Sequence, residues 1–447
     1  MIDLRIIITI VFFIALTWYV YSKRNAMQAQ KVLPPLLYFS MYRTTWGLKT
    51  MDSWAKKYAR ILNWLGISGV VIGFLGMVFI CFALIKSLID LLAKPESPAG
   101  VGLVLPFKAK GIFYVPIEYW IICIFVIALV HEFSHGVLSR VYGVKVKASG
   151  FAFAGTTIRT LGIILLIIGL WGNVKEGAGF NIGLSSSSDI LMIVGAVMLA
   201  FSLLSNITAP IIPAAFVEPD EKKLRKKPLM QQLAVFGAGP FSNVILGFIA
   251  LGLLFALAPL SDGMIQANGV EITDFVEGDF PAEAVGILPG EIIQSVNGIP
   301  TPYIENLSAQ LSSKKPNEII DLRTNKGQYS ITLSKNPENQ SMAYLGAYLS
   351  QSSDIKPDVK ERYWFLPHVI IWLSGLLMFM FILNLGIGLF NLVPIGPLDG
   401  GRMLHLVLIT YMEKEKAIKL FGMVGMFFLI IVLMNVLFPF LKPLFNF

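Results

Sequence analysis

The sequence is poor in charge, histidine and cysteine, and each scarcity excludes a class of protein. Charged residues make up only 14% of the 447 residues, while hydrophobic residues make up 55%; a soluble domain has about 25% charged residues. The two cysteines, Cys81 and Cys123, both lie in apolar runs, which excludes a disulfide framework. The net charge of +8 follows short loops between apolar runs, so we expect no nucleic-acid partner.

Long apolar runs are what the sequence has in abundance. A helix needs about twenty apolar residues to cross the hydrocarbon core of a bilayer. We therefore predict a polytopic α-helical membrane protein with about eight transmembrane segments. We expect the first segment to be a retained anchor, because it lacks the basic start and the cleavage site of a signal peptide. The predicted segments are Leu4–Tyr21, Leu62–Lys86, Ile117–Tyr142, Ile158–Trp171, Ile190–Ser205, Leu233–Leu257, Pro367–Leu389 and Ile418–Phe440.

Lysine and arginine between these segments predict the orientation. Basic residues gather in Lys23–Arg60 and in Lys222–Lys227, with a weaker group in Glu413–Lys419. Cytoplasmic loops are enriched in such residues, and alternation of eight spans places all three groups inside and both termini outside. We interpret Lys23–Arg60 as a solvated cytoplasmic loop that lies on anionic lipid.

Residues Gly263–Ser350 interrupt the membrane pattern. They are polar and turn-rich, and Gly269–Val276 alternates like a half-buried strand. The run Phe280–Gly298 resembles bacterial-type PDZ domains, in which such a run forms a short helix and a strand that ends in a hairpin turn. We expect a small β-rich PDZ-like domain on the extracytoplasmic side that binds a peptide ligand as an added strand; an unrelated β-rich insert is the alternative.

A His-Glu-x-x-His pentad, His131 to His135, lies inside the third apolar segment. Residues four apart lie on one face of a helix, so both imidazoles can bind one Zn²⁺ while Glu132 faces an activated water. The alternative is a pair of polar residues packed in a helix bundle. Ionisable side chains within a membrane helix are costly and mark function by default, which favours the metal site.

A hydrolytic zinc site usually has three protein ligands, so one ligand remains to be found. His368 begins the seventh segment near the outer face, far from the pentad, and His405 is closer. A run broken by proline and glycine, Asn391 to Arg402, follows the seventh segment at the depth of His135. Broken backbone is tolerated in a membrane where it lines a cavity, and Asp399 in this run can supply a carboxylate oxygen. The alternative is a surface turn in which proline and glycine only end a helix.

Together the two motifs resemble the site-2 protease family of intramembrane zinc metalloproteases. The resemblance implies zinc ligands at His131, His135 and Asp399 and a general base at Glu132. Ala215–Glu221 and Gly239–Asn243 also resemble family stretches near the active site. Hydrogen bonds from Asn243 or Asn391 to the oxyanion or substrate are expected. In the broken run from Asn391 to Arg402, the other residues that match the second family motif are Asn391, Pro394, Pro397, Gly400 and Gly401.

One departure from the family concerns its substrate-edge β-hairpin. Ser149–Phe151 and Pro213–Phe216 are expected to be nearly adjacent, yet Ile158–Ser205, an expected membrane hairpin, stands between them. We expect this insertion to split the β-hairpin. The predicted organisation is 1–95 for anchor helices and basic loop, 96–262 for the first part of the protease core, with the insertion at 158–205, 263–350 for the PDZ-like domain, and 351–447 for the second part of the core.

The resemblance implies hydrolysis of transmembrane segments of membrane-anchored substrate proteins by a zinc-activated water. The expected location is a multi-pass protein of the cell membrane, in contact with the lipid bilayer, with its active site near the cytoplasmic face. Two rivals are a zinc protease acting on soluble peptides, and a catalytically inactive receptor or scaffold with a PDZ-like peptide-binding domain. An inactive relict should bind little metal, so zinc content separates it from an enzyme.

Overall fold

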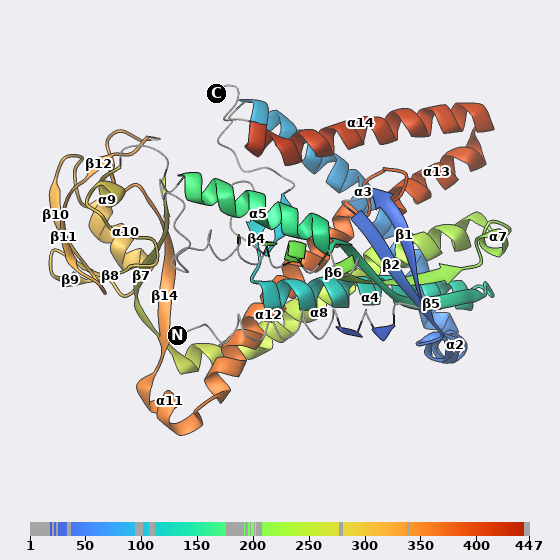
Figure 1. Cartoon of the computed structure of the whole chain (residues 1–447), viewed down its shortest axis with the longest axis horizontal. Coiled ribbons are helices and arrows are strands. Elements are labelled where there is room, and N and C mark those ends of the chain that lie inside the picture. Colours follow the sequence, from blue (N-terminus) through green and yellow to red (C-terminus); the bar gives the residue numbers. More distant parts are fainter. Residues whose placement is uncertain are drawn as a thin grey trace. The chain divides into compact units, whose positions relative to one another are not determined.

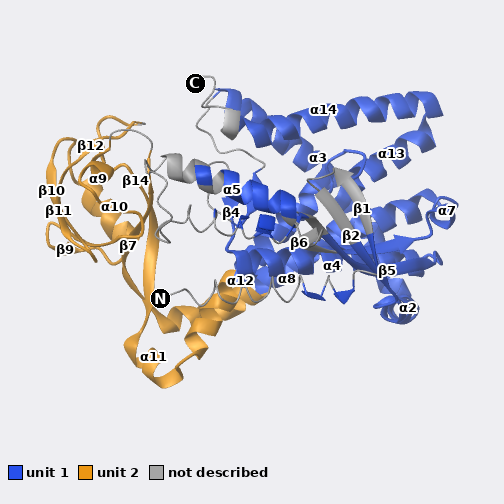
Figure 2. Cartoon of the chain, viewed as in Figure 1, with its two compact units in different colours: residues 1–252, 376–447 blue, residues 253–375 orange. Residues whose placement is uncertain are grey.

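A computed structural model of the chain gives its architecture (Figure 1). Apart from isolated positions within 18–23 and 192–202, it describes residues 26–33, 37–93, 102–106, 112–175, 208–276, 280–337 and 339–441. The chain forms two compact units, one of residues 1–252 and 376–447 and the other of residues 253–375 (Figure 2). The pentad and the broken run, 264 residues apart between His135 and Asp399, therefore belong to one unit.

Five of the described helices are long and apolar enough to cross a membrane: α3 (Ala59–Ala93), α4 (Ile117–Val141), α8 (Leu229–Met264), α12 (Leu366–Phe390) and α14 (Lys414–Leu441). They correspond to five of the eight predicted segments, so the count of eight is not confirmed. Ile158–Trp171 is helical within α5 (Ile158–Lys175) but is not among the five. Leu4–Tyr21 and Ile190–Ser205 lie almost entirely outside the described residues.

Small residues bring α3 and α8 close together in the first unit. A β-carbon on Gly237 would lie 2.8 Å from the carbonyl oxygen of Gly69, so only glycine permits this backbone approach. Farther along α3, Ser87 donates a 2.7 Å hydrogen bond to the Asn435 side chain of α14, and both are buried. The first contact holds α8, the helix that faces the pentad, against α3, and the second holds α3 against α14.

A four-stranded antiparallel sheet adjoins the helices, in the order β1 (Met27–Leu33), β2 (Leu37–Thr44), β5 (Val146–Thr157), β6 (Thr208–Pro219). Strands β5 and β6 pair over their whole lengths, from Val146 opposite Pro219 to Thr157 opposite Thr208. The expectation of a split hairpin is therefore wrong. The insertion leaves from the far end of the hairpin, where it interrupts no strand pairing.

The interpretation of Lys23–Arg60 as a solvated loop is also wrong. Strand β2 pairs with β5 from Tyr38 opposite Gly155 to Thr44 opposite Ser149. Strand β1 pairs with the other edge of β2. Helix α2 (Leu48–Lys57) then leads directly into α3. The described strands and helix of this segment satisfy their backbone hydrogen bonds in sheet and helix, which the count of basic residues could not indicate.

The second unit contains a sheet in the order β11 (Gln328–Thr332), β10 (Ile319–Thr324), β8 (Ile292–Val296), β7 (Ile265–Phe275), β14 (Ala347–Ile355), with β9 (Ile299–Pro300) paired to β8. Helix α10 (Ile304–Ser312) buries Leu307 against it. The turn between β8 and β9 uses positive φ at Asn297 and Gly298, as the Asn-Gly signal predicts. Strand β14 continues five residues beyond the predicted domain end at Ser350.

The remaining described elements are short or connect the parts already named. They are β3 (Leu103–Leu105), β4 (Ile112–Tyr114), α7 (Glu221–Leu224), α9 (Pro281–Ala284), β12 (Ser334–Lys335), β13 (Ala343–Tyr344), α11 (Pro357–Tyr363) and α13 (Asp399–Tyr411). Among them, α13 and α7 contribute directly to the site described next.

Candidate active site

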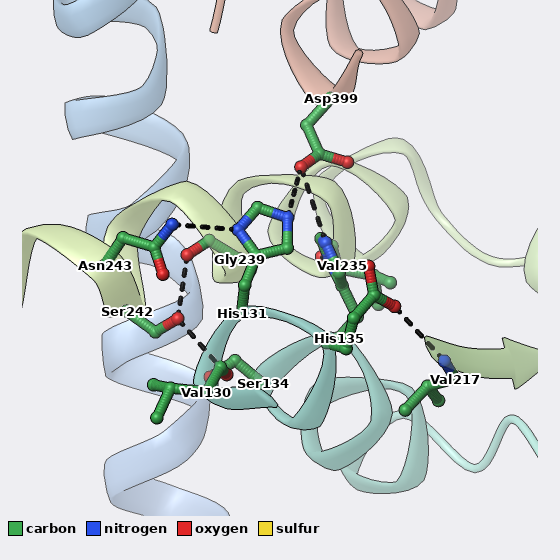
Figure 3. Close-up of polar contacts among 11 residues, drawn as sticks. Val130, His131, Ser134, His135, Val217, Val235, Gly239, Ser242, Asn243 and Asp399 are labelled. Carbon is green, nitrogen blue, oxygen red and sulfur yellow. Dashed lines mark hydrogen bonds and ion pairs between the residues drawn. The ribbon is translucent and has the colours of Figure 1, made fainter. Parts of the chain in front are cut away.

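Three metal-ligand side chains converge in the first unit (Figure 3). His131 and His135 lie one helical turn apart on α4, and Asp399 is the first residue of α13. Asp399 Oδ2 lies 3.0 Å from His131 Nε2 and 3.4 Å from His135 Nε2. The three ligand atoms lie within 4.8 Å of one another, and His131 and Asp399 are buried. Side chains of this kind at this spacing form a tridentate metal site.

Gly239 on α8 keeps the centre of this cluster open. A β-carbon at this position would lie 2.5 Å from the Nε2 atoms of both histidines. Ligand atoms around a tetrahedral zinc ion lie about 2.0–2.2 Å from the metal, so a side chain here would compete with the ion for the same space. The donor set and the cradle left by Gly239 therefore fit a zinc ion.

The far side of the His135 ring is held by backbone. Its Nδ1 atom lies 2.6 Å from the carbonyl oxygen of Val235 on α8. Because a carbonyl only accepts hydrogen bonds, this contact requires hydrogen on Nδ1 and leaves the Nε2 lone pair directed at Asp399 and the cluster centre. The tautomer that a metal needs is thus fixed by α8.

Asn243, one turn beyond Gly239 on α8, lies behind the other ring. Its amide nitrogen is 3.2 Å from His131 Nδ1, and the side chain is fully buried. Its Oδ1 has no hydrogen-bond partner in the part of the chain that the structure describes. Oxygen and nitrogen of an amide are assigned from the hydrogen-bond network. If the Asn243 amide is turned over, its Oδ1 accepts a hydrogen bond from His131 Nδ1–H, and His131 Nε2 is then free to bind a metal ion.

Glu132 is held on the other side of the cluster by the sheet. Its Oε2 accepts a 3.2 Å hydrogen bond from the backbone N–H of Val217 on β6. Val217 pairs with Ser149 on β5, but its N–H points to the edge of β6 that faces α4. The strand therefore positions a carboxylate next to the ligand cluster.

A cavity of about 730 Å³ opens beside the ligand cluster. Glu132, Asn391 and the three metal-ligand side chains line it, together with residues of β6, α7, α8 and α13. Arg402, three residues after Asp399, lies in its wall with the guanidinium 5.8 Å from the centre of the Phe236 ring. Charged, polar and apolar side chains all contribute to the cavity wall.

The structure separates the sequence candidates. It brings together His131, His135 and Asp399, with Glu132 beside them. His405 lines the same cavity, but its ring packs on Phe421 at 4.9 Å, outside the cluster. His368 belongs to the second unit. The backbone oxygen of Asn391 accepts a 2.9 Å hydrogen bond from Gly400 N, which closes the broken run just before α13.

Sequence reasoning missed the backbone partners of the site. Val235 and Val217 act through a carbonyl and an amide, which every residue type carries, so their identity gives no signal. Gly239 and Asn243 stood in a stretch that resembled the family, but residue types alone did not indicate that one provides space and the other a ring partner.

The chain is similar to several known proteins. An uncharacterized protein of Methanocaldococcus jannaschii is 26% identical over 370 residues, covering 81% of this chain and 75% of its own length. The zinc metalloprotease RasP of Shouchella clausii is 26% identical over 271 residues, covering 49% of this chain and 62% of its own length. The PDZ domain of an SdrC-like protein from Listeria monocytogenes matches 18% of this chain and 87% of its own at 22% identity, with a TM-score of 0.17, too low to establish a common fold.

The model of Peptidase family M50 matches residues 119–432, which is most of the chain and includes the pentad, Gly239, Asn243 and the Asp399 run. The match begins in the first turn of α4 and ends within α14, so it extends through both units. The chain therefore belongs to Peptidase family M50, the site-2 protease family of metalloproteases.

Proposed function

We propose that the protein is a zinc-dependent intramembrane metalloprotease that cleaves the transmembrane segments of membrane-anchored proteins. The observation that carries the proposal is a cavity, between helices able to span a membrane, that holds His131, His135, Asp399 and Glu132 together. His135 lies six residues before the end of α4, about 9 Å along the helix axis. A peptide bond would thus be reached below the lipid headgroups.

The residues have separate tasks in this reaction. His131, His135 and Asp399 would hold the zinc ion, which supplies Lewis acidity that makes water nucleophilic near neutral pH and polarises a carbonyl. Glu132 would take a proton from the attacking water and return it to the amine that leaves. The N–H of Val217 keeps the Glu132 carboxylate aimed into the cavity during both transfers.

The two asparagines take different roles in this proposal. Asn391 lines the cavity and is placed to donate a hydrogen bond to substrate or oxyanion. Asn243 instead contacts the ring of His131 on the side away from Nε2. We therefore assign Asn243 to positioning His131, and not to contact with substrate.

The substrate must enter as an extended chain, because a hydrogen-bonded helix hides its carbonyl groups. The edge of β6 that carries the Val217 N–H borders Glu132 and the cavity. A substrate segment lying along this edge would bring a peptide bond beside the catalytic carboxylate, with β-strand pairing replacing its lost helical hydrogen bonds. Helix-poor residues in the target should favour cleavage.

The wider organisation is part of the same proposal. The protein would be a multi-pass protein of the cell membrane, with lipid bilayer and membrane-anchored proteins as partners. Its active site would lie near the cytoplasmic face, as the basic residues Lys222–Lys227 indicate. The second unit would be a PDZ-like extracytoplasmic domain that binds a peptide and filters or docks substrates.

The test is proteolysis by purified protein in detergent of a panel of single-span membrane substrates. Wild type should give products whose masses place the cut within the span, and Asp399→Ala should give none. Asp354→Ala, an aspartate of the second unit, serves as the matched control and should cleave normally. Zinc content after EDTA dialysis and back-titration separates an enzyme from an inactive scaffold. Products that are all cut outside the span, or equal cleavage by Asp399→Ala, would reject the proposal.

A further inference from the structure

The segment from Trp46 to Trp64, which contains α2 and the first two turns of α3, exposes an unusual set of side chains, which we call the basic aromatic surface. The exposed fraction is 60% for Trp46 and 67% for Trp64, large values for tryptophan. Between residues 46 and 60 there are four basic residues and one acidic residue, Asp52, which lies 3.2 Å from Arg140. The surface comprises Trp46, Lys49, Trp54, Lys56, Lys57, Tyr58, Arg60 and Trp64, all exposed.

This surface lies where a membrane helix begins. Helix α3 starts at Ala59, two residues after α2 ends, and its 35 residues exceed the roughly twenty that the hydrocarbon core requires. The basic residues at this end favour placing the excess length there, so that α2 and the first turns of α3 lie at the headgroup level. Tryptophan and tyrosine concentrate in that layer, and lysine there is attracted to anionic lipid. Charge and continuity with a span favour lipid over an acidic protein as the partner.

The opposite face of α2 packs on the catalytic helix. Met51 and Ala55 are buried, and a β-carbon on Gly136 would lie 2.7 Å from Met51 Sδ. Trp54, although part of the basic aromatic surface, also meets the Phe133 ring edge to face, with centroids 5.4 Å apart, and so links the two faces of α2. Phe133 lies within the pentad and Gly136 follows it directly. A shift of α2 would thus move the segment that carries Glu132 and both histidines.

We propose that the basic aromatic surface binds the headgroups of anionic phospholipids, and that α2 held in this way braces the Phe133–Gly136 segment, so that anionic lipid raises the rate of cleavage. The lipid-binding part stands on the contacts and charges of α2 alone. The rate part rests on the proposed protease function, and the experiment separates the two.

Lipid binding is measured with the full chain in nanodiscs that contain brominated phosphatidylcholine or brominated phosphatidylglycerol, since bromine quenches nearby tryptophan. The signal of the surface is the part of the fluorescence that disappears in Trp46→Phe/Trp54→Phe. We expect phosphatidylglycerol to quench this part severalfold more effectively. The preference should vanish in Lys49→Gln/Lys56→Gln/Lys57→Gln, because each lysine near an anionic surface contributes on the order of fivefold to binding.

Two controls keep the result interpretable. Lys222→Gln/Lys223→Gln/Lys226→Gln removes the same charge from exposed positions in and after α7 and should retain the preference. High salt should abolish the preference in the unmutated protein, which needs no variant to fold. Equal quenching of wild type by the two lipids, or a preference that the α2 variant retains, would overturn the lipid site.

Cleavage of a single-span substrate in the same nanodiscs tests the brace. Wild type should cleave several times faster with phosphatidylglycerol than with phosphatidylcholine alone, and the α2 variant should cleave equally slowly in both. Selective quenching with no rate difference would overturn the brace and leave the lipid site. No cleavage by wild type in any bilayer would instead count against the protease proposal, while quenching still decides the lipid site.

Discussion

Glu132 on α4 accepts a hydrogen bond from the backbone N–H of Val217, a residue of β6 that lies 85 positions later in the chain. The contact joins the pentad to the edge of the sheet, so one strand both orients the carboxylate and borders the cavity. In the proposed reaction Glu132 is the general base, and the Val217 contact holds its carboxylate at the cavity wall before substrate arrives.

Replacement of Glu132 by glutamine should abolish cleavage and leave metal binding intact. The amide retains the shape of the carboxylate but cannot accept a proton, and general acid–base groups contribute about 10²–10⁴-fold to rate. The measurement pairs product mass spectrometry with zinc content of the same preparation. Glu283→Gln, on α9 in the second unit, is the control for a single lost charge. A Glu132→Gln protein with full activity would reject the assignment of the base.

Gly239→Ala should lose zinc while the helix bundle stays folded. The added methyl group would stand 2.5 Å from His131 Nε2 and His135 Nε2, in the space of the ion, although alanine is a better helix former than glycine. Gly252→Ala on the same helix is the matched control, since nothing lies within 4 Å of its β-carbon. Zinc content and far-ultraviolet circular dichroism are measured together. Normal zinc binding by Gly239→Ala would show that the ion binds elsewhere.

Asn243→Leu should weaken zinc binding about 10–100-fold, the usual effect of removing a partner of a ligating histidine. Leucine fills a similar volume but cannot accept from His131 Nδ1–H, so the ring loses its fixed tautomer. Competition with a chelator gives the affinity, and Asn243→Asp, which keeps an acceptor, should retain most of it. Asn384→Leu, on α12, is the control for loss of a buried asparagine. Equal affinities for Asn243→Leu and wild type would refute the positioning role.

The sequence predicted those parts of the site that depend on the type and the local spacing of side chains. His131, Glu132 and His135 lie within one helical turn, so their spacing alone predicts a shared face. Asp399 was selected over His405 because proline and glycine break the backbone before it, and the structure places Asp399, not His405, beside the histidines. A sequence can therefore predict which side chains share one face of a helix, and it can also predict where proline and glycine end a helix.

The errors arose where pairing partners are distant. The many lysine and arginine residues around β1 and β2 indicate a basic loop, whereas β2 pairs with β5, more than one hundred residues away, and β1 in turn pairs with β2. The hairpin of β5 and β6 was expected to be split because an insertion of some fifty residues looks disruptive. Loop closure costs little more for a long connection than for a short one, so the strands pair unchanged.

Glu291 in the second unit makes the stability of that unit depend on pH. The carboxylate is buried, which alone would raise its pKa, but hydrogen bonds from Thr324, Leu288 N and Tyr329, with the charge of Lys326, hold the pKa below its ordinary value. A lowered pKa in the folded state stabilises the fold above the unfolded-state pKa, near 4, and this contribution is lost as pH falls through the folded-state value. The protection factors of amides in strands β7, β8 and β10 of the full chain, which are corrected for the intrinsic effect of pH on exchange, should therefore fall below about pH 4. In Glu291→Gln these protection factors should be lower at neutral pH and change less on acidification, while Glu305→Gln, exposed on α10, should behave as wild type. An identical pH dependence in Glu291→Gln and wild type would contradict this assignment.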